Sequence, residues 1–581
     1  MKIKAIFLLF TLIVILFLVA SPGQDLTSHS KHEVEDFTLL DHNGNSYHLY
    51  YNLGQKAVVL MSYELGCLIA RQSVITLEQL RQRYEKKGFQ FILIDASRED
   101  QREALQKEVK KLKIHIPILM DESQIVSESL GLTRTAEVIL IEPKSWRIVY
   151  RGPIDDQKEY LRLAFESLRW GWPLKDKKVP TKGRLIKFEN PVKQISYTQD
   201  VVPILEKHCV VCHYTDGPAP WAMTDYKKIT TWSKMMREAL RVKRMPPPSA
   251  DPYYGEYLNN NYLKADELRT LIHWIESQCP KEESEDPIPA IEKARAKNQW
   301  PYGEPDIILT AKNIQHLPAT GVPHWQFNFS KETIPKDLWA KAIVYKPSTK
   351  RTIHHALAMT PVKSPYQNSQ RPFDQEGVLK SDEELLCGYT SQWQEIPFPQ
   401  GTGKFLPKGS RIKFATHYIT TGKPETDQPQ LGIYLSQQPL KPLIYMYMQM
   451  NKFKIPKKTQ AHQLTAQHTF KEGVMLYGVS PHAHYRSRSA KVTAVYPDKN
   501  EEILLSVPSF DSAWETLHLF KNPKFMPAGT IIKVESTFDN SIFNPKNPNP
   551  NQDVTFSMER VEGEMFWTLL AYSVVEENDQ K

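Results

Sequence analysis

The apolar run Phe89-Gln90-Phe91-Ile92-Leu93-Ile94-Asp95 has the length of a strand, and it follows an amphipathic stretch, Leu77–Lys87, that has helical spacing. A similar run, Ala57–Met61, precedes the amphipathic stretch, and a third run, Glu137–Ile141, comes later. Short, almost continuously apolar runs are typical of strands that are buried on both faces. The alternation of strands with a helix therefore predicts an α/β domain over residues 33–156.

The whole chain is too long for one hydrophobic core. It has 581 residues, of which 41% are hydrophobic and 24% are charged, and these proportions are typical of globular domains. Its net charge is +8, but its lysines and arginines form no long block. We therefore interpret the charge as a solubility feature and expect no nucleic-acid partner.

The N-terminal residues have the pattern of an export signal. A short basic segment, Met1–Lys4, precedes an unbroken apolar run, Ala5–Ala20, which is shorter than the ~20 residues that usually span a membrane. Leu18 stands where a cleavage site prefers a small residue, so residues 1–22 fit either a cleaved signal peptide or an uncleaved anchor. In both cases we expect an exported, periplasmic protein, and in the second case residues 5–20 tether it to the inner membrane.

Two charged or proline-bearing segments, residues 157–193 and 284–303, are predicted linkers. Between them, residues 194–283 show helical patterns. After them the pattern changes to short alternating segments separated by glycine, proline and asparagine, which predicts strands. Because ~270 residues are enough for two β-sandwiches, we place one over residues 304–437 and another over residues 438–577.

The run Cys209-Val210-Val211-Cys212-His213 lies in the helical segment and has the C-x-x-C-H pattern. In such a run the two thiols form thioethers with the haem vinyl groups, and the histidine is held beneath the iron. A structural zinc site is the alternative, but it needs two further ligands, and the sequence contains no second C-x-x-C. We therefore predict one covalent haem c, held by Cys209, Cys212 and His213.

A methionine in a rigid loop is the predicted sixth ligand of the haem iron. Met245 lies in Arg244-Met245-Pro246-Pro247-Pro248, where the prolines rule out a place inside a helix. Ligation by methionine and histidine raises the haem potential and suits electron transfer. With its closing helix, Ala265–Ser277, the segment from Tyr197 to Cys279 resembles a class I cytochrome c domain, which implies an all-α fold. Three other methionines compete for the role: Met223, Met235 and Met236.

A single cysteine follows the first buried run of the α/β domain, in Gly66-Cys67-Leu68-Ile69-Ala70-Arg71. Residues 33–155 resemble the redoxin branch of the thioredoxin-like fold, which places the attacking thiolate at a helix N-terminus. Ala70 stands where a C-x-x-C motif has its second cysteine, and the loop that often carries a cis-proline reads Thr135-Ala136-Glu137. We therefore expect no local dithiol, and Cys67 is either an inert buried thiol, a redox thiol or part of a docking or sensing surface.

Histidines gather in three short segments of the C-terminal half. His482 and His484 are two residues apart, so on a strand they point to the same face and chelate one ion. The thioether of Met565 would add a soft ligand. Two imidazoles with one thioether favour copper over zinc or magnesium.

An adjacent pair, His354 and His355, would point to opposite faces of a regular strand. Joint binding of one ion therefore requires a β-bulge or a strand end at this pair. His417 would then complete a second copper site, made only of imidazoles.

These histidine segments resemble those of the copper type II, ascorbate-dependent monooxygenase family, which includes peptidylglycine α-hydroxylating and dopamine β-monooxygenases. The resemblance covers residues 304–577 and implies two jelly-roll-like all-β sandwiches with one copper ion in each, facing each other across a cleft. It also implies ascorbate or another one-electron reductant, one copper that relays electrons and one that binds dioxygen beside the substrate. The relay copper corresponds to His354, His355 and His417, and the catalytic copper to His482, His484 and Met565.

Departures from the family limit the expected substrate. Ser480 replaces the arginine that anchors the substrate carboxylate in peptide-amidating enzymes, and Leu569 replaces a tyrosine after the ligand methionine. Cys387 is the only cysteine in this half, so the disulfides of the animal enzymes cannot form. A glycine-extended peptide is therefore not the expected substrate.

Together these features lead to one functional hypothesis with two alternatives. The sequence predicts an exported copper monooxygenase that hydroxylates a C–H bond of a small-molecule substrate with dioxygen. An external donor reduces the haem, and electrons then pass through the relay copper to the catalytic copper. The first alternative is a non-catalytic periplasmic electron carrier or redox sensor with haem and copper, and the second is a thiol-dependent peroxidase that uses Cys67.

Overall fold

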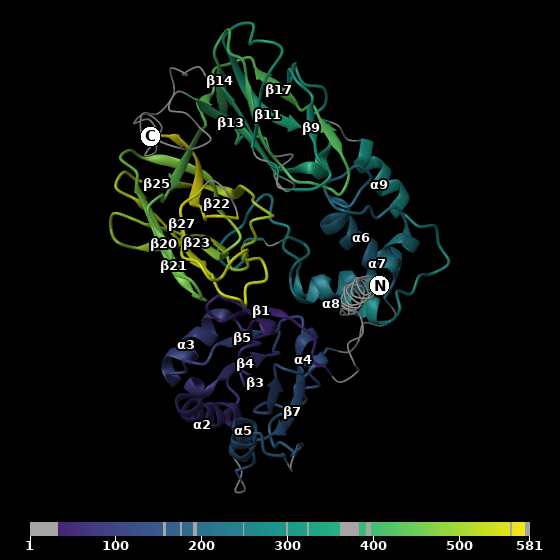
Figure 1. The fold of residues 1–581 in the computed structure, drawn as a ribbon, viewed down its shortest axis with the longest axis vertical. Helices are drawn as coiled ribbons and strands as arrows, with labels where there is room; N and C mark the ends of the chain where they lie inside the picture. Colours follow the sequence, from purple (N-terminus) through teal and green to yellow (C-terminus); the bar gives the residue numbers. More distant parts are fainter. Residues whose placement is uncertain are drawn as a thin grey trace, which may run out of the picture.

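The computed structural model has three regions, namely an α/β domain, a helical segment and a large β-rich region (Figure 1). The predicted signal or anchor, residues 1–22, lies outside the described residues. Within the part of the chain that the structure describes, no helix has the length and apolar character that a membrane span requires. The described residues are 33–154, 159–174, 177–189, 195–247, 249–297, 300–321, 323, 325–360, 383–390, 397–557 and 561–575.

The α/β domain is built on one seven-stranded sheet with the order β2-β1-β5-β4-β3-β6-β7. Its three central strands β3, β4 and β5 are parallel, and the outer strands are antiparallel to their neighbours. This topology confirms the α/β prediction. The strands are β1 (Thr38–Asp41), β2 (Ser46–His48), β3 (Ala57–Tyr63), β4 (Phe89–Asp95), β5 (Ile118–Met120), β6 (Val138–Glu142) and β7 (Arg147–Gly152).

Four helices complete this domain. Helix α2 begins directly after Cys67, earlier than predicted. The predicted helix Leu77–Lys87 therefore covers only the second half of α2 and the short 3-10 helix η3 (Glu85–Lys87). Helix α5 lies inside the predicted linker 157–193, and the linker prediction is wrong there because Phe165 is buried in the domain core. The helices are α2 (Leu68–Tyr84), α3 (Arg102–Leu112), α4 (Ile125–Ser129) and α5 (Tyr160–Trp170).

Residues 195–297 form the helical segment. Its core contains Tyr197 and Trp274, whose rings stack with centroids 5.7 Å apart. Ile288 of α9 is buried in the same core, so the segment extends into residues 284–303, which we had predicted to be a linker. The helices are η4 (Tyr197–Val201), α6 (Val202–Leu205), η5 (Glu206–Val210), α7 (Tyr226–Arg241), α8 (Ala265–Glu276) and α9 (Ile288–Lys297).

The β-rich region consists of two sandwiches, each with its own apolar core. The first pairs the sheets β10-β15-β12-β13 and β18-β14-β11-β17-β8, and the second pairs β19-β28-β22-β25 and β21-β26-β23-β24. Two small sheets, β16-β9 and β20-β27, lie beside them. Strand β17 ends at Ser436 and β19 begins at Ile444, close to the predicted boundary at residue 438.

The strands of the first sandwich and its flanking sheet are β8 (Ile307–Thr310), β9 (Gln315–Leu317), β10 (Gln326–Phe329), β11 (Leu338–Lys346), β12 (Ile353–Thr360), β13 (Glu384–Thr390), β14 (Thr402–Leu406), β15 (Lys413–Tyr418), β16 (Glu425–Asp427), β17 (Gln430–Ser436) and β18 (Lys441–Pro442). Those of the second are β19 (Ile444–Gln449), β20 (Lys454–Ile455), β21 (His462–Thr469), β22 (Val474–Ala483), β23 (Ser487–Val495), β24 (Glu501–Val507), β25 (His518–Met526), β26 (Ile531–Phe538), β27 (Val554–Thr555) and β28 (Phe566–Val574).

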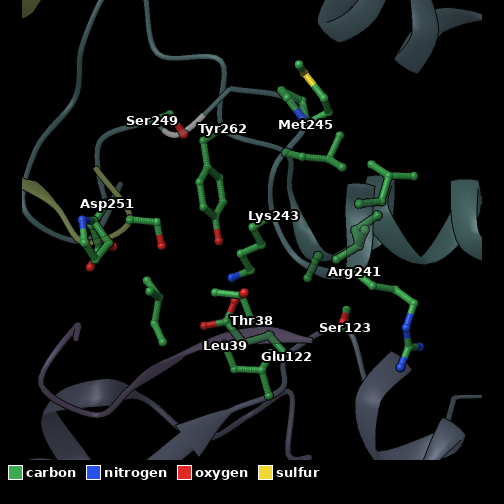
Figure 2. A pocket seen from close by; sticks show the side chains of 18 of the residues that line it. Thr38, Leu39, Glu122, Ser123, Arg241, Lys243, Met245, Ser249, Asp251 and Tyr262 are labelled. Carbon is green, nitrogen blue, oxygen red and sulfur yellow. The ribbon is translucent and has the colours of Figure 1, made fainter. Parts of the chain in front are cut away.

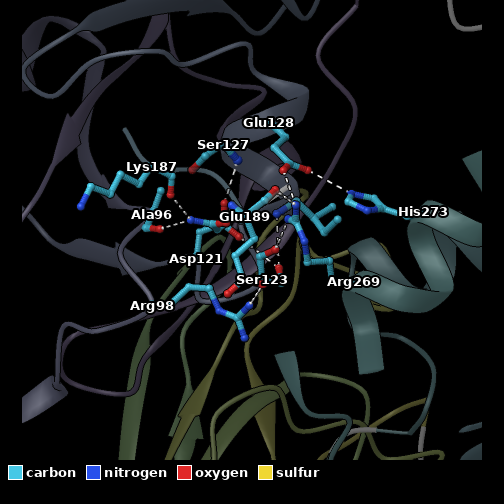
Figure 3. Close-up of polar contacts among 12 residues, drawn as sticks. Ala96, Arg98, Asp121, Ser123, Ser127, Glu128, Lys187, Glu189, Arg269 and His273 are labelled. Atoms are coloured by element: carbon cyan, nitrogen blue, oxygen red, sulfur yellow. Dashed lines mark hydrogen bonds and ion pairs between the residues drawn. The ribbon is translucent and has the colours of Figure 1, made fainter. Parts of the chain in front are cut away.

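Arg269 of α8 docks the helical segment onto the α/β domain (Figure 3). Its guanidinium donates hydrogen bonds to the Ser123 carbonyl at 3.0 Å, the Glu128 carboxylate at 2.7 Å and the Glu189 carbonyl at 2.9 Å. His273, one turn further along α8, contacts Glu128 at 3.1 Å. Because a planar guanidinium directs its donors rigidly, these three acceptors fix the orientation of α8 against the α/β domain.

A buried ion pair joins the α/β domain to Asp251 of the helical segment, whose backbone in turn contacts the second sandwich. Arg102 of α3 donates to the Asp251 carboxylate at 2.6 Å, and both side chains are at most 7% exposed. The backbone N–H of Asp251 donates to the carbonyl of Ser506 in β24 at 2.8 Å. Asp251 therefore contacts both regions at once.

We expect Arg102→Met to destabilise the full chain by about 3–5 kcal/mol, because it leaves a buried carboxylate without its cation. Urea unfolding of the full chain measures the loss. Arg98→Met is the matched control, since its partners Glu189 and Asp266 are 55% and 74% exposed and each such pair contributes about 0–1 kcal/mol. Equal losses in the two variants would contradict a structural role of the buried pair.

Candidate haem and metal sites

One helical turn presents the two cysteines and the histidine of the C-x-x-C-H run to a common cavity. The backbone N–H groups of Cys212 and His213 both donate to the Cys209 carbonyl, at 3.0 and 2.9 Å. All three side chains line a cavity of about 230 Å³. This is the arrangement that attachment of a porphyrin to both thiols requires.

His213 is oriented by a backbone acceptor. Its Nδ1 lies 2.9 Å from the Trp221 carbonyl, and a proton on Nδ1 leaves Nε2 as the lone-pair donor. Burial lowers the pKa of His213, which keeps the imidazole neutral, and only a neutral imidazole can ligate a metal. The residue thus has the tautomer and charge of a haem ligand.

The rest of the cavity wall is mostly apolar. Trp221 and Trp232 stack with ring centroids 5.1 Å apart, and Trp514 reaches the wall from the second sandwich. Met245 lines the cavity as predicted, but so do all of its competitors, so the sixth ligand stays a prediction. These competitors are Met223, Met235 and Met236.

A second cavity adjoins the first and lies against the α/β domain (Figure 2). Met245 lines both cavities, and Leu39 of β1 closes the second from the opposite side. Lys243 projects into it, and burial lowers the pKa of this ammonium group. The α/β domain therefore approaches the loop that carries Met245 through β1. Cys67 is absent from the linings of both cavities.

The structure brings His354, His355 and His417 together in the first sandwich, near the start of β12 and the end of β15. His355 of β12 lies directly opposite His417 of β15. The strand register shifts between Ile353 and His355, which is the irregularity that joint binding requires. All three imidazoles are buried, and one ligand nitrogen from each lies within 4.8 Å of the others. Such a group can hold one metal ion.

Trp325 packs on two of these imidazoles. Its ring centroid lies 5.2 Å from that of His417, nearly parallel, and 4.9 Å from that of His355. The indole limits the rotation of both rings and keeps water from their faces.

His482 and His484 form the second histidine set, at the end of β22. Their ring centroids are 5.6 Å apart, and His482 packs on Trp567 of β28 at 4.4 Å. In the part of the chain that is described, the Nε2 atom of His482 is buried without a hydrogen-bond partner. A buried polar atom without a partner is costly, and a metal ion would remove that cost.

Strand pairing also brings Met565 to this set. Ala483 lies opposite Phe566 in the β22–β28 ladder, so the next step of the same register places His484 opposite Met565. The buried Glu564 carboxylate accepts hydrogen bonds from the backbone N–H groups of both residues. Burial raises the pKa of Glu564 to about 7. Glu564 thus ties the backbone of His484 to that of Met565, and joint binding of one ion by His482, His484 and Met565 stays a prediction.

Glu515 lies between the two histidine sets, and the sequence analysis missed it. Its Oε2 is 2.8 Å from Nδ1 of His482 and 3.4 Å from Nδ1 of His355. Burial by itself would raise the pKa of this carboxyl, but the two imidazoles hold it well below its usual value. A single glutamate in a loop carries no spacing signal that sequence reasoning could use.

The two sets adjoin each other. The rings of His355 and His482, which belong to different sandwiches, have centroids only 6.0 Å apart. The family resemblance implies one copper in each domain, facing each other across a cleft. The two rings lie closer together than that arrangement implies.

Cys67 occupies the N-cap position of α2 and is buried. Its sulfur lies 3.3 Å from the Thr135 hydroxyl. Burial acts to raise the thiol pKa, but Thr135, the backbone N–H groups at the start of α2 and the positive charge of Arg184 outweigh it, so the pKa of Cys67 is lowered. All five cysteines are free.

Comparison with known proteins identifies the α/β domain. Residues 31–156 match the model of the AhpC/TSA family. Residues 31–156 form a redoxin domain. No curated protein matches the chain.

Solved structures that resemble the chain cover about a quarter of it. A hypothetical protein from Sinorhizobium meliloti 1021 is 24% identical, with 28% of this chain and 97% of that chain covered and a TM-score of 0.26. A putative thiol:disulfide interchange protein DsbE from Chlorobium tepidum is 19% identical (24% and 99% covered, TM-score 0.22). Peroxidoxin BcpB from Mycobacterium tuberculosis is 18% identical (24% and 98% covered, TM-score 0.21).

We expect the Cys67 thiol to react with iodoacetamide at lower pH than an ordinary thiol, whose pKa is about 8.5, because its thiolate is stabilised. Thr135→Val removes the hydroxyl contact and should move the midpoint of the pH profile to higher pH. Mass spectrometry of the Cys67 peptide gives the alkylation rate. Thr38→Val is the control, since that buried hydroxyl contacts no hydrogen-bond partner among the described residues. Identical midpoints for the Thr135 variant and the wild type would contradict the role of the Thr135 hydroxyl in lowering the pKa of Cys67.

Proposed function

We propose that this protein is an exported, periplasmic copper-dependent monooxygenase-like redox enzyme that hydroxylates a C–H bond of a small molecule with dioxygen, using electrons supplied through a haem c. The observation that carries the proposal is the convergence of His354, His355 and His417, whose ligand nitrogens lie within 4.8 Å of one another. His417 is distant in sequence from the adjacent pair His354 and His355. A structural role alone does not require three buried imidazoles to meet.

The donor set fits copper. Imidazole and thioether donors suit copper, whereas magnesium and calcium prefer oxygen ligands. His354, His355 and His417 would hold one ion, and His482, His484 and Met565 the other. When bound, copper at these residues supplies one-electron chemistry with dioxygen.

The chain's own residues prepare these sites. Trp325 and Trp567 shield the imidazole faces, which keeps the site dry and limits ring rotation. Glu564 holds the backbone of His484 and Met565 in register. Preorganised ligands of this kind need little rearrangement when a metal binds.

The cavity of the helical segment fits a haem c. Two thiols, a neutral imidazole and several thioethers surround an apolar space. Cys209 and Cys212 would attach the porphyrin, and His213 and Met245 would ligate its iron. Trp514 belongs to this wall, and the next residue, Glu515, contacts both histidine sets, so one peptide unit connects the two sites.

A thiol-dependent peroxidase is the second candidate function, because the redoxin domain has a buried cysteine with a lowered pKa at a helix N-terminus. Its chemistry does not need the metal sites. The two functions can coexist in one chain.

Metal analysis of protein matured in the periplasm tests the first proposal. We expect one haem and two copper ions per chain, with His417→Ala losing one copper and Cys209→Ala losing the haem. Elemental analysis and the visible spectrum of the denatured haem give both counts. His316→Ala, an exposed histidine of the first sandwich, should keep both coppers. A wild-type protein without copper would refute the proposal.

Oxygen consumption separates the enzyme from an electron carrier. With ascorbate as the reductant, we expect substrate-dependent oxygen uptake coupled to a hydroxylated product, screened over small molecules with activated C–H bonds. His482→Ala should reduce this uptake to the level of the copper-free protein. Reversible haem and copper reduction without any product would favour the non-catalytic carrier or sensor.

Peroxide reduction tests the second candidate. Cys67→Ser should abolish thiol-dependent peroxide consumption, and His482→Ala should leave it unchanged, because the two residues lie in different domains. Activity that survives Cys67→Ser would exclude this thiol as the attacking group.

A further inference from the structure

We propose that Glu515 is a shared ligand that joins the two histidine sets into one dinuclear copper centre. This inference rests on the proposed function, since it needs copper at both sets. Glu515 lies in the segment between β24 and β25 of the second sandwich, and its carboxylate reaches His355 of the first sandwich as well as His482 of its own. Glu515 therefore contacts a histidine of each set.

The distances suit shared coordination. Donor atoms that bind one ion at ~2.1 Å in tetrahedral geometry lie roughly 3.4 Å from one another. The Oε2 atom of Glu515 lies 3.4 Å from Nδ1 of His355 and 2.8 Å from Nδ1 of His482. A small rotation of the His482 side chain brings the second distance into the same range.

Burial points to a cation near the carboxylate. Glu515 is only 9% exposed, and its Oε1 has no hydrogen-bond partner among the described residues. A buried carboxylate is stable only beside compensating charge, and two bound cations supply it through both oxygens.

The separation of the sets allows one carboxylate to bridge them. The rings of His355 and His482 have centroids 6.0 Å apart. The Glu515 carboxylate contacts both of these rings, so one side chain reaches a potential ligand of each set. The alternative is that Glu515 only pairs electrostatically with the imidazoles and binds no metal.

Copper loading with electron paramagnetic resonance decides between these two roles. The full-length protein is titrated with Cu(II), bound copper is counted by elemental analysis, and the copper signal is integrated at field positions free of ferric haem. A carboxylate-bridged Cu(II) pair couples magnetically, so the wild type should bind two coppers but show far fewer than two spins. Glu515→Gln, which cannot bridge, should either raise the signal severalfold toward two spins or lose a copper. Glu502→Gln, which removes a carboxylate paired with Lys524 on the same sandwich, should behave as the wild type.

The outcomes separate this inference from the proposed function. Two coppers with two full spins in the wild type overturn the shared ligand and leave the proposed function standing, and this measurement needs no variant to fold. An unchanged spin count in Glu515→Gln, with both coppers retained, also overturns it. A wild type that binds no copper overturns both.

Discussion

The buried carboxylate of Glu515, held between imidazoles of two different sandwiches, is the contact on which the arrangement of the two histidine sets depends. Both histidine sets are fixed within their own sheets, one by the β12–β15 pair and the other by the β22–β28 pair. Their mutual distance, however, depends on how the sandwiches pack. The segment that carries Glu515 continues into Leu517 and Leu519, which are buried in the core of the first sandwich. Apolar packing of Leu517 and Leu519 thus fixes the position of Glu515. Its carboxylate then places a negative charge between the two histidine sets.

The same segment explains why the cavity lined by Cys209, Cys212 and His213 lies beside Glu515, the residue after Trp514. The stretch after the Met245 loop runs along the start of β25, where the Leu258 N–H donates to the Leu519 carbonyl at 2.9 Å and the Asn259 side chain donates to the Leu517 carbonyl at 2.7 Å. These bonds hold the loop of Trp514 against the helical segment. The haem cavity is therefore completed by the second sandwich, and it would lack one wall if the sandwiches were removed.

Local patterns in the sequence predict local geometry well here, and contacts between regions poorly. Strand geometry predicts that His482 and His484, two residues apart, point to the same face. The adjacent pair His354 and His355 can bind one ion only at an irregularity, and β12 has a register shift between Ile353 and His355. Glu515 carries no periodic signal, because its role comes from a loop that meets a histidine from another domain. Helix α5 was not predicted for a related reason, because its charged outer face resembles a linker. Only the folded sheet shows that Phe165 of α5 packs on Phe91 of β4.

The placement of the redoxin domain separates thiol chemistry from metal chemistry. Its sheet meets the rest of the chain through β1, through α4 and through Arg102 of α3, on the side that carries the second cavity. Cys67 instead follows the central strand β3 and packs against Thr135. Because the thiol lines neither cavity, direct exchange with a bound haem would require the domain to turn, which the Arg269 and Arg102 contacts oppose. The redoxin domain thus packs against the loop that carries Met245 through β1, whereas its buried Cys67 lies away from that contact.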